Sequence, residues 1–350
     1  MKLGDFTCGR DNNFNLIRFL AAIGVLVSHA YPLSLGRGTA EPLSTTLGIS
    51  LGTLCVYIFF AISGLLITQS WINSNSFLRW VSARVLRIIP GLAVVLILTV
   101  LVLGPITTSQ TQAEYWADAS IYSYVPRNLI LFDIQYDLPG VFAETPYSEI
   151  VNGSIWTLRF EALCYTAIAV LGLSGAFRSP VIAAVCISLW IGFAFLWVLT
   201  AETIVVPFNL FYFCYFSLPF ATGCALFVVR RHVPLNVTVA LALVFLLFVT
   251  RGTTWFTLTL PLAVSYSVAY LAYVPSGALM RFNAIGDYSY GFYIYAFPSQ
   301  QFVAWLIPGV SPLKNMLVAF VITLTFAVLS WHVVERPSLR IKERFAQRAV

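Results

Sequence analysis

Long apolar runs follow one another along the chain, separated by short polar segments. A helix needs roughly 20 apolar residues to cross the hydrocarbon core of a membrane. Runs of about this length lie near 16 to 35, 47 to 70, 86 to 106, 155 to 174, 180 to 200, 204 to 229, 235 to 250, 254 to 274, 287 to 307 and 312 to 334. The pattern predicts an all-α fold, a polytopic membrane helix bundle with about ten transmembrane helices.

The composition of these runs indicates helices and not strands, and two of the segments leave the number of helices open. Stretches such as VVLILTVLVLG and LALVFLLFV are apolar on every face, whereas the strands of a membrane barrel alternate in polarity. The run at 235 to 250 is short, and the segment 107 to 153 holds one ambiguous apolar patch, VPRNLILF. Nine and eleven helices therefore stay open as alternatives.

Lysine and arginine residues concentrate on one side of the predicted membrane. With ten crossings, the side that holds both termini carries 15 of them, and the other side carries Arg37, Arg127, Arg251 and Lys314. Short cytoplasmic loops retain basic residues, so both termini are predicted to be cytoplasmic. We expect a multi-pass protein of the inner (plasma) membrane. Its net charge of +6 then reflects this sorting and contact with membrane lipids, not nucleic-acid binding.

No polar linker or low-complexity tract divides the chain, so residues 1–350 are expected to form a single integral-membrane domain. Its one long loop, 107–153, is acidic and is predicted to be non-cytoplasmic. Loops of this length are commonly functional, so this one either covers an acceptor site or is a solvated connector. Six cysteines are scattered without a CxxC pair, and we expect neither a disulfide nor a metal site.

Four ionisable residues of the predicted spans stand out as candidates. They are His29 in the first span, Arg159 and Glu161 in the fourth, and Asp287 at the start of the ninth. A charge inside a membrane is costly, so each of these residues is a functional candidate.

Arg18 and His29 are expected on one face of the first helix. Their spacing of eleven residues is about three helical turns and a rise of roughly 16 Å. Glu161 is expected at a depth similar to that of His29, where the two could meet. A neutral imidazole beside a carboxylate can accept a proton from a hydroxyl, which makes His29 and Glu161 candidate catalytic residues. The alternatives are a histidine bonded to a neighbouring helix and a structural pair of Glu161 with Arg159.

The segment before the third run reads FLRWVSARVLRIIPG and is rich in arginine. Arg84 and Arg87 are three residues apart and so share a helix face. Together with Arg18 they could hold the phosphates of a nucleotide-bearing donor, because guanidinium binds phosphate through two hydrogen bonds. The alternative is positive-inside anchoring to lipid phosphates.

The sequence lacks several motifs of other enzyme classes. It has no P-loop, no GxSxG elbow and no HExxH pair, and no GxGxxG follows a strand pattern. ATP hydrolysis and serine-hydrolase chemistry are therefore disfavoured.

Six motifs, in order along essentially the whole chain, carry a resemblance to a known family. They are NLIRFLAAIGVLVSHAYPL, VYIFFAISGLLIT, RVLRIIP, SIWTLRFEALCY, GDYSYGFYIYAFP and VVERPSLR. In this order they resemble the acyltransferase 3 family of membrane O-acyltransferases. The chain departs from many relatives at Ala296, where they have a histidine, so a second catalytic histidine is excluded at that position.

The resemblance implies roles for individual residues and substrates. The donor would be acetyl-CoA or another acyl-CoA, bound by Arg18, Arg84 and Arg87, with no metal. His29 would be the catalytic histidine and Glu161 an essential polar partner. The residues expected to contact substrate are Ser63, Arg159 and Tyr288, although packing between helices is the alternative for Tyr288.

Two functions from different classes fit these features. The first is a membrane O-acyltransferase, in particular an O-acetyltransferase, which moves an acyl group from cytoplasmic acyl-CoA to a hydroxyl of a carbohydrate such as an exopolysaccharide, an O-antigen or a lipid-linked oligosaccharide. The second is a transporter or flippase for a glycan or lipid-linked sugar, which would also need buried charges and many helices. The sequence leaves the acceptor and the oligomeric state open.

Overall fold

The structure, a computed structural model, describes residues 1–7, 11–74, 76–201 and 204–340. Eight helical segments in these residues are long and apolar enough to cross a membrane. They are Phe14–Leu35 (α2), Leu51–Ile72 (α4), Phe77–Thr107, Gly153–Leu173, Pro180–Thr200 (α10), Phe208–Val228 (α11), Phe256–Tyr273 (α13) and Pro312–Arg340. Within the described residues no strand is present, apart from two isolated bridges. The all-α membrane bundle predicted from the apolar runs is confirmed. Eight of the ten predicted runs form helices of this length and composition, and the count of ten crossings stays a prediction.

Three of these segments are composite. The third joins α5 (Phe77–Leu98), a π-helical turn η1 (Thr99–Leu103) and α6 (Gly104–Thr107). The fourth joins a 3₁₀ turn η2 (Gly153–Thr157) and α9 (Leu158–Leu173). The last joins α16 (Pro312–Ser330) and a second π-helical turn η5 (Trp331–Glu335).

The two remaining predicted crossings also form helices, but one of them is short and the other is mostly buried inside the bundle. The short run at 235 to 250 forms α12 (Val237–Thr250), which has only 14 residues. The run at 287 to 307 forms α15 (Ser289–Leu306), most of whose residues are buried inside the bundle. Because neighbouring helices shield α15 from lipid, it can carry polar side chains such as Gln300 and Gln301, both fully buried.

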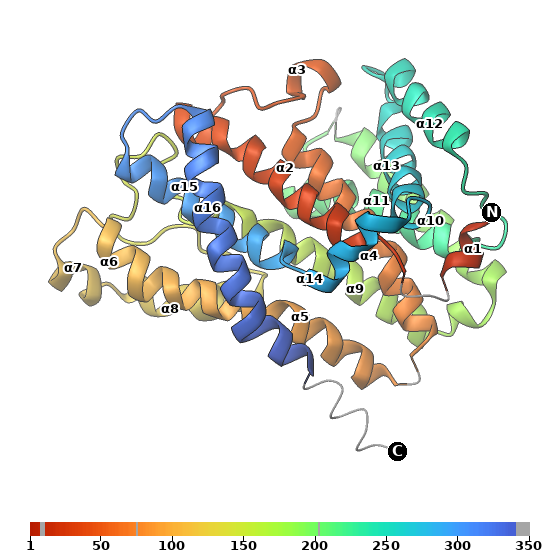
Figure 1. Cartoon of the computed structure of the whole chain (residues 1–350), viewed down its shortest axis with the longest axis horizontal. Coiled ribbons are helices and arrows are strands. Elements are labelled where there is room, and N and C mark those ends of the chain that lie inside the picture. Colours follow the sequence, from red (N-terminus) through yellow and green to blue (C-terminus); the bar gives the residue numbers. More distant parts are fainter. Residues whose placement is uncertain (8–10, 75, 202–203, 341–350) are drawn as a thin grey trace.

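Small helices fill the connections. They are α1 (Leu3–Phe6), α3 (Ser44–Leu47), α7 (Gln112–Ala117), α8 (Ala119–Ile130), η3 (Ala176–Arg178), η4 (Gly277–Arg281) and α14 (Phe282–Ile285). The apolar patch VPRNLILF falls mainly in α8, which at 12 residues is too short to cross a membrane. In Figure 1 α6, α7 and α8 lie together at one end of the molecule.

The centre of the bundle is the contact between α4 and α11. Buried residues make up 67% of the apolar window of α4 and 72% of that of α11, against 17% for the peripheral α10. The two backbones approach so closely that a Cβ at Gly64 would lie 1.9 Å from the carbonyl oxygen of Phe220, and one at Gly223 would lie 2.3 Å from that of Ala61. Small residues permit such contacts between membrane helices. The α4–α11 contact thus fixes the position of Ser63, the neighbour of Gly64.

Helices α2 and α15 pack against each other and against α16, and α2 also packs on α4 (Figure 1). This arrangement places the first helix, with Arg18 and His29, between the central α4 and the buried α15. The predicted functional residues of α2 therefore face protein on both sides.

Candidate functional site

The three arginines predicted to bind a donor meet in one cavity. This space, the arginine cavity, has a volume of about 350 Å³. Its charged lining residues are Arg18, Arg84, Arg87, Glu161 and Asp287. Three guanidinium groups thus face two carboxylates, which leaves an excess of positive charge when all are ionised. Such a lining suits a ligand that carries phosphate groups.

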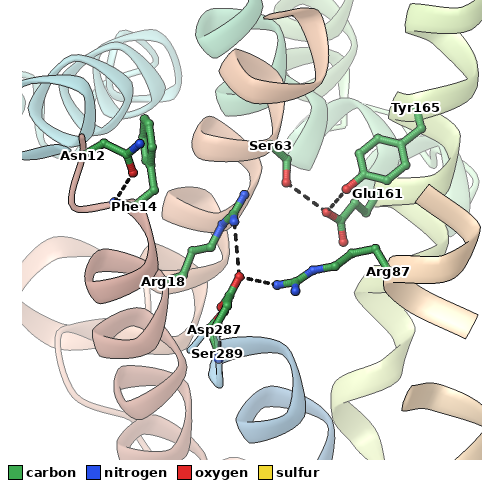
Figure 2. A network of polar contacts seen from close by, with 9 residues as sticks. All are labelled: Asn12, Phe14, Arg18, Ser63, Arg87, Glu161, Tyr165, Asp287 and Ser289. Carbon is green, nitrogen blue, oxygen red and sulfur yellow. Dashed lines mark hydrogen bonds and ion pairs between the residues drawn. The ribbon is translucent and has the colours of Figure 1, made fainter. Parts of the chain in front are cut away.

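Asp287 joins two of these arginines (Figure 2). Its Oδ2 accepts a hydrogen bond of 2.6 Å from Arg87 Nη2 and lies 3.7 Å from Arg18 Nη1. Its Oδ1 accepts hydrogen bonds from the Ser289 hydroxyl at 2.5 Å and from the Ser289 backbone N–H at 3.3 Å. Every polar atom of the carboxylate is therefore engaged, and the two arginines are held at fixed positions.

The charge of Asp287 is stabilised by these contacts. Burial by itself raises the pKa of Asp287, but the guanidinium groups of Arg87 and Arg18 and the Ser289 hydrogen bonds together lower that pKa below its ordinary value of 3.8. The residue lies outside the helices, between α14 and α15. It is consequently ionised at neutral pH.

Arg84 differs from the other two arginines. It lines the arginine cavity, but its buried Nε has no hydrogen-bond partner within the described part of the chain. A buried donor left unpaired is costly, and an acceptor atom of a bound ligand would remove that cost. Arg84 is therefore the arginine of this cavity best placed to respond to a ligand.

Glu161 lies on the wall of the arginine cavity and faces the arginines (Figure 2). Its Oε1 accepts a hydrogen bond of 2.9 Å from the Ser63 hydroxyl and another from the hydroxyl of Tyr165, one helical turn further along α9. Arg159 turns away from it, donating from Nη1 to Asn209 Oδ1 at 2.8 Å. The alternative of a Glu161–Arg159 pair therefore finds no support in the contacts.

His29 lies in a different cavity. This space, the histidine cavity, has a volume of about 540 Å³ and is also lined by Arg37, Glu41, Tyr147, Trp156 and Tyr212. The Nδ1 atom of His29 is buried and has no hydrogen-bond partner among the described residues. Its ring meets that of Phe297 edge to face, with centroids 5.5 Å apart. The expected contact of His29 with Glu161 is not present, because the two side chains line separate cavities.

The arginine and histidine cavities share part of their walls. Val56, Thr157 and Tyr293 line both of them. The hydroxyls of Thr157 and Tyr293 are hydrogen-bonded at 2.7 Å, and the Tyr293 hydroxyl also donates to the Ser154 carbonyl at 2.9 Å. These three residues therefore belong to a wall that the two cavities share.

The long loop 107–153 contributes to the histidine cavity. Tyr136, Tyr147 and Ile150 from this loop line it. The loop is tied to the bundle by Gln301 Nε2, which donates to the carbonyls of Tyr147 and Ile150 at 2.6 and 2.7 Å. The loop thus forms one wall of the space that contains His29.

The residues expected to contact substrate have different surroundings. Ser63 lines the arginine cavity, whereas Arg159 and Tyr288 are not part of the lining of either cavity. The hydroxyl of Tyr288 contacts the Ile285 carbonyl at 3.1 Å and His332 Nε2 at 3.3 Å. These contacts favour the packing alternative for Tyr288.

Several lining residues were not singled out from the sequence as site residues. Tyr165 could have been found from its i, i+4 spacing to Glu161, which places both on one helix face. Asp287 was identified as a costly charge, but its arginine partners are far away in the sequence. Glu41 lies in a loop and Tyr293 in an aromatic-rich run, and neither context carries a periodic signal.

Comparisons with known proteins identify the family of the chain. The family model described as an acyltransferase domain matches residues 11–333. The chain is 32% identical over 335 residues to an O-acetyl transferase of Shigella phage Sf6, a match that covers 93% of this chain and 96% of that protein. It is also 32% identical over 186 residues to Nodulation protein 10 of Rhizobium leguminosarum bv. viciae, covering 48% of this chain and 46% of the relative. No solved structure matches.

The family match spans nearly the whole chain, and the phage relative matches over almost its full length. These findings confirm the resemblance carried by the six motifs. The chain is a multi-pass membrane protein that belongs to the acyltransferase 3 family of membrane O-acyltransferases.

Proposed function

We propose that this acyltransferase moves an acetyl or other short acyl group from acyl-CoA, held in the arginine cavity, to a hydroxyl of a carbohydrate held in the histidine cavity. The observation that carries the proposal is the shared wall. A cavity rich in guanidinium groups and a cavity that contains an imidazole meet at Val56, Thr157 and Tyr293. Donor and acceptor can thus approach from opposite sides and react at this wall.

The arginine cavity supports the choice of donor. Coenzyme A carries phosphate groups, and guanidinium groups bind phosphate with charge-assisted hydrogen bonds. Arg87 and Arg18 are oriented by Asp287, and Arg84 has an unpaired buried donor atom. With the arginine side facing the cytoplasm, as the positive-inside pattern predicts, the donor enters from inside the cell.

His29 supplies the base in the proposed reaction. Its imidazole accepts the proton of the acceptor hydroxyl while the hydroxyl oxygen attacks the carbonyl carbon of the thioester. The carbon–sulfur bond then breaks as the carbon–oxygen bond forms, and the imidazolium returns the proton to the departing thiolate of CoA. Atoms and charges balance without a metal or a covalent intermediate on the protein.

Glu161 acts on the donor side in this proposal. Ser63 and Tyr165 hold its carboxylate in the arginine cavity, so it does not set the tautomer of His29. Held opposite the arginines, it confines phosphate groups to the guanidinium side through like-charge repulsion.

The test uses the purified full chain in lipid nanodiscs with acetyl-CoA. Methyl glycosides of glucose, galactose, rhamnose and N-acetylglucosamine serve as acceptor probes. We expect CoA release that depends on the acceptor, together with an acetyl mass gain on the glycoside. The His29→Ala variant should lose transfer and still bind acetyl-CoA, because its donor cavity is intact. Transfer by His29→Ala, or no acceptor-dependent CoA release by the unaltered protein, would overturn the proposal.

The same experiment addresses the transporter or flippase. In sealed vesicles, movement of a glycoside across the membrane without loss of thioester would support transport. The family membership favours the transferase, since the matched model describes an acyltransferase domain.

A further inference from the structure

Glu41 is a carboxylate in the histidine cavity that the proposed reaction does not use. It lies in the segment between α2 and α4 and is partly buried. Its Oε2 accepts a hydrogen bond from the hydroxyl of Ser28, the residue before His29 in α2. The Ser28 oxygen in turn accepts a hydrogen bond of 2.8 Å from the backbone N–H of Gly52.

These bonds attach Glu41 to the helical turn that carries His29. Ser28 is fully buried, so its hydroxyl cannot exchange its partners for water. A Cβ at Gly52 would lie 3.2 Å from the Ser28 hydroxyl and 3.5 Å from Glu41 Oε2, which shows how closely the three residues pack. The carboxylate therefore keeps a set position relative to the imidazole.

Glu41 retains capacity for further hydrogen bonds. An ionised carboxylate offers about four lone-pair sites and donates nothing. The hydroxyls of Ser28 and Ser50 both hydrogen-bond to the carboxylate and occupy two of these sites. The remaining capacity faces a cavity and can be met only by groups that donate hydrogen bonds, such as hydroxyls.

Aromatic rings and a guanidinium complete the surroundings. Tyr147 and Trp156 line the same cavity. Arg37 lies over the Tyr147 ring, 4.9 Å from its centroid, and donates to the Ser148 carbonyl at 2.7 Å. A carboxylate beside aromatic rings matches a polyol, whose hydroxyls donate hydrogen bonds while its C–H faces cover the rings.

We propose that Glu41 binds the acceptor: it accepts hydrogen bonds from a hydroxyl next to the reacting one and so selects which hydroxyl of a sugar faces His29. The inference rests on the proposed function, because it assumes that the histidine cavity receives the acceptor. It adds a specificity-determining residue and a ligand chemistry, a sugar with neighbouring hydroxyls, to that cavity.

The test compares a parent glycoside with its deoxy analogues, using the full chain in nanodiscs and acetyl-CoA. Among the methyl glycosides that the unaltered protein accepts, each hydroxyl other than the reacting one is removed in turn. One analogue should lose about 10- to 100-fold in kcat/KM, since it leaves the Glu41 carboxylate without its partner. The Glu41→Ala variant should show the same loss on the parent glycoside and no further loss on that analogue.

Two measurements keep the outcome specific to Glu41. The KM for acetyl-CoA should be unchanged in Glu41→Ala, which also shows that the variant is folded. Glu41→Gln, which keeps the shape of the side chain, replaces it if the alanine variant does not fold. Glu144→Ala, which removes an exposed carboxylate of the long loop, is the matched control and should behave as the unaltered protein.

Three results would overturn the role of Glu41. They are an unchanged kcat/KM of Glu41→Ala for the parent glycoside, an equal loss on the parent and on every deoxy analogue, and a raised KM for acetyl-CoA. In each case the unaltered protein still transfers acetyl groups, so the proposed function stands. Failure of the proposed function has its own signature, namely no acceptor-dependent CoA release by the unaltered protein.

Discussion

The guanidinium of Arg87 and the carboxylate of Asp287 are 200 positions apart in the chain and are joined by a hydrogen bond of 2.6 Å. The same carboxylate lies 3.7 Å from Arg18. Helix α5, helix α2 and the entry to α15 are therefore linked through one side chain at the arginine cavity. The arrangement of the donor site depends on this residue.

Asp287→Ala should raise the KM for acetyl-CoA by about tenfold and leave the acceptor KM unchanged, because Arg18 and Arg87 lose the group that orients them. Removing one partner of a buried ion pair costs about 3–5 kcal/mol. We expect less here, about 1–3 kcal/mol of unfolding free energy, because the Arg87 side chain is 23% exposed. Steady-state kinetics and thermal unfolding in detergent check both effects. Asp287→Asn keeps an acceptor oxygen and should lose less, whereas a lowered KM would show that Asp287 competes with the donor.

The stability of the protein should depend on pH through the ionisation of Asp287. The pKa of Asp287 in the folded protein lies below its ordinary value of 3.8. Its contribution is therefore fully present above that value and is lost as the pH falls through the lower folded pKa. The melting temperature of the unaltered protein should therefore drop more steeply than that of Asp287→Asn once the pH falls below 3.8. Parallel curves for the two proteins would contradict this assignment.

Arg84→Gln should weaken donor binding without weakening the fold. Its buried Nε has no hydrogen-bond partner among the described residues, so little is lost in the empty protein. A hydrogen bond to a charged group contributes about 1.5–3 kcal/mol, which corresponds to a KM for acetyl-CoA raised about 10- to 100-fold. S-acetylpantetheine lacks the phosphates and should be used equally well by the variant and the unaltered protein. A reduced rate with that donor would assign Arg84 to another step.

Tyr293→Ala should change the preference for acyl chain length. Tyr293 lines both cavities, and loss of its ring would open space in the wall between them. We expect the ratio of kcat/KM for butyryl-CoA to that for acetyl-CoA to rise about tenfold, which corresponds to about 1.4 kcal/mol. Competition between the two donors, read by mass spectrometry of the product, measures this ratio. Tyr295→Ala is the control, since Tyr295 lies two positions further along α15 and lines a separate apolar pocket.

Hydropathy predicted the crossings well because lipid imposes a direct requirement on every helix that faces it. Helices α2, α4, α10 and α11 lie close to the predicted ranges, and the third crossing begins earlier, at Phe77. Helix α15 is not among the eight apolar helices, and the same requirement explains this. A helix enclosed by other helices does not face lipid and need not be apolar, so its hydropathy is lower.

The site was only partly predictable from the sequence. The spacing of Arg18 and His29 fixes their common helix face, and the spacing of Arg84 and Arg87 does the same in α5. Hydropathy gives the depth of Glu161, but depth does not say which helices are neighbours around the bundle. The structure places Glu161 beside the arginines and not beside His29. Loop residues such as Glu41 carry no periodicity and become visible only in three dimensions.

The enclosed position of α15 has a consequence for how the protein is made. A helix that carries Gln300 and Gln301 is poorly suited to partition into lipid by itself during synthesis. Helix α16 follows after a short turn and packs along it. We expect the two to leave the translocon together as a hairpin, so that Asn315 of α16 can already donate to the Gln300 carbonyl at 3.1 Å when both helices reach the bilayer.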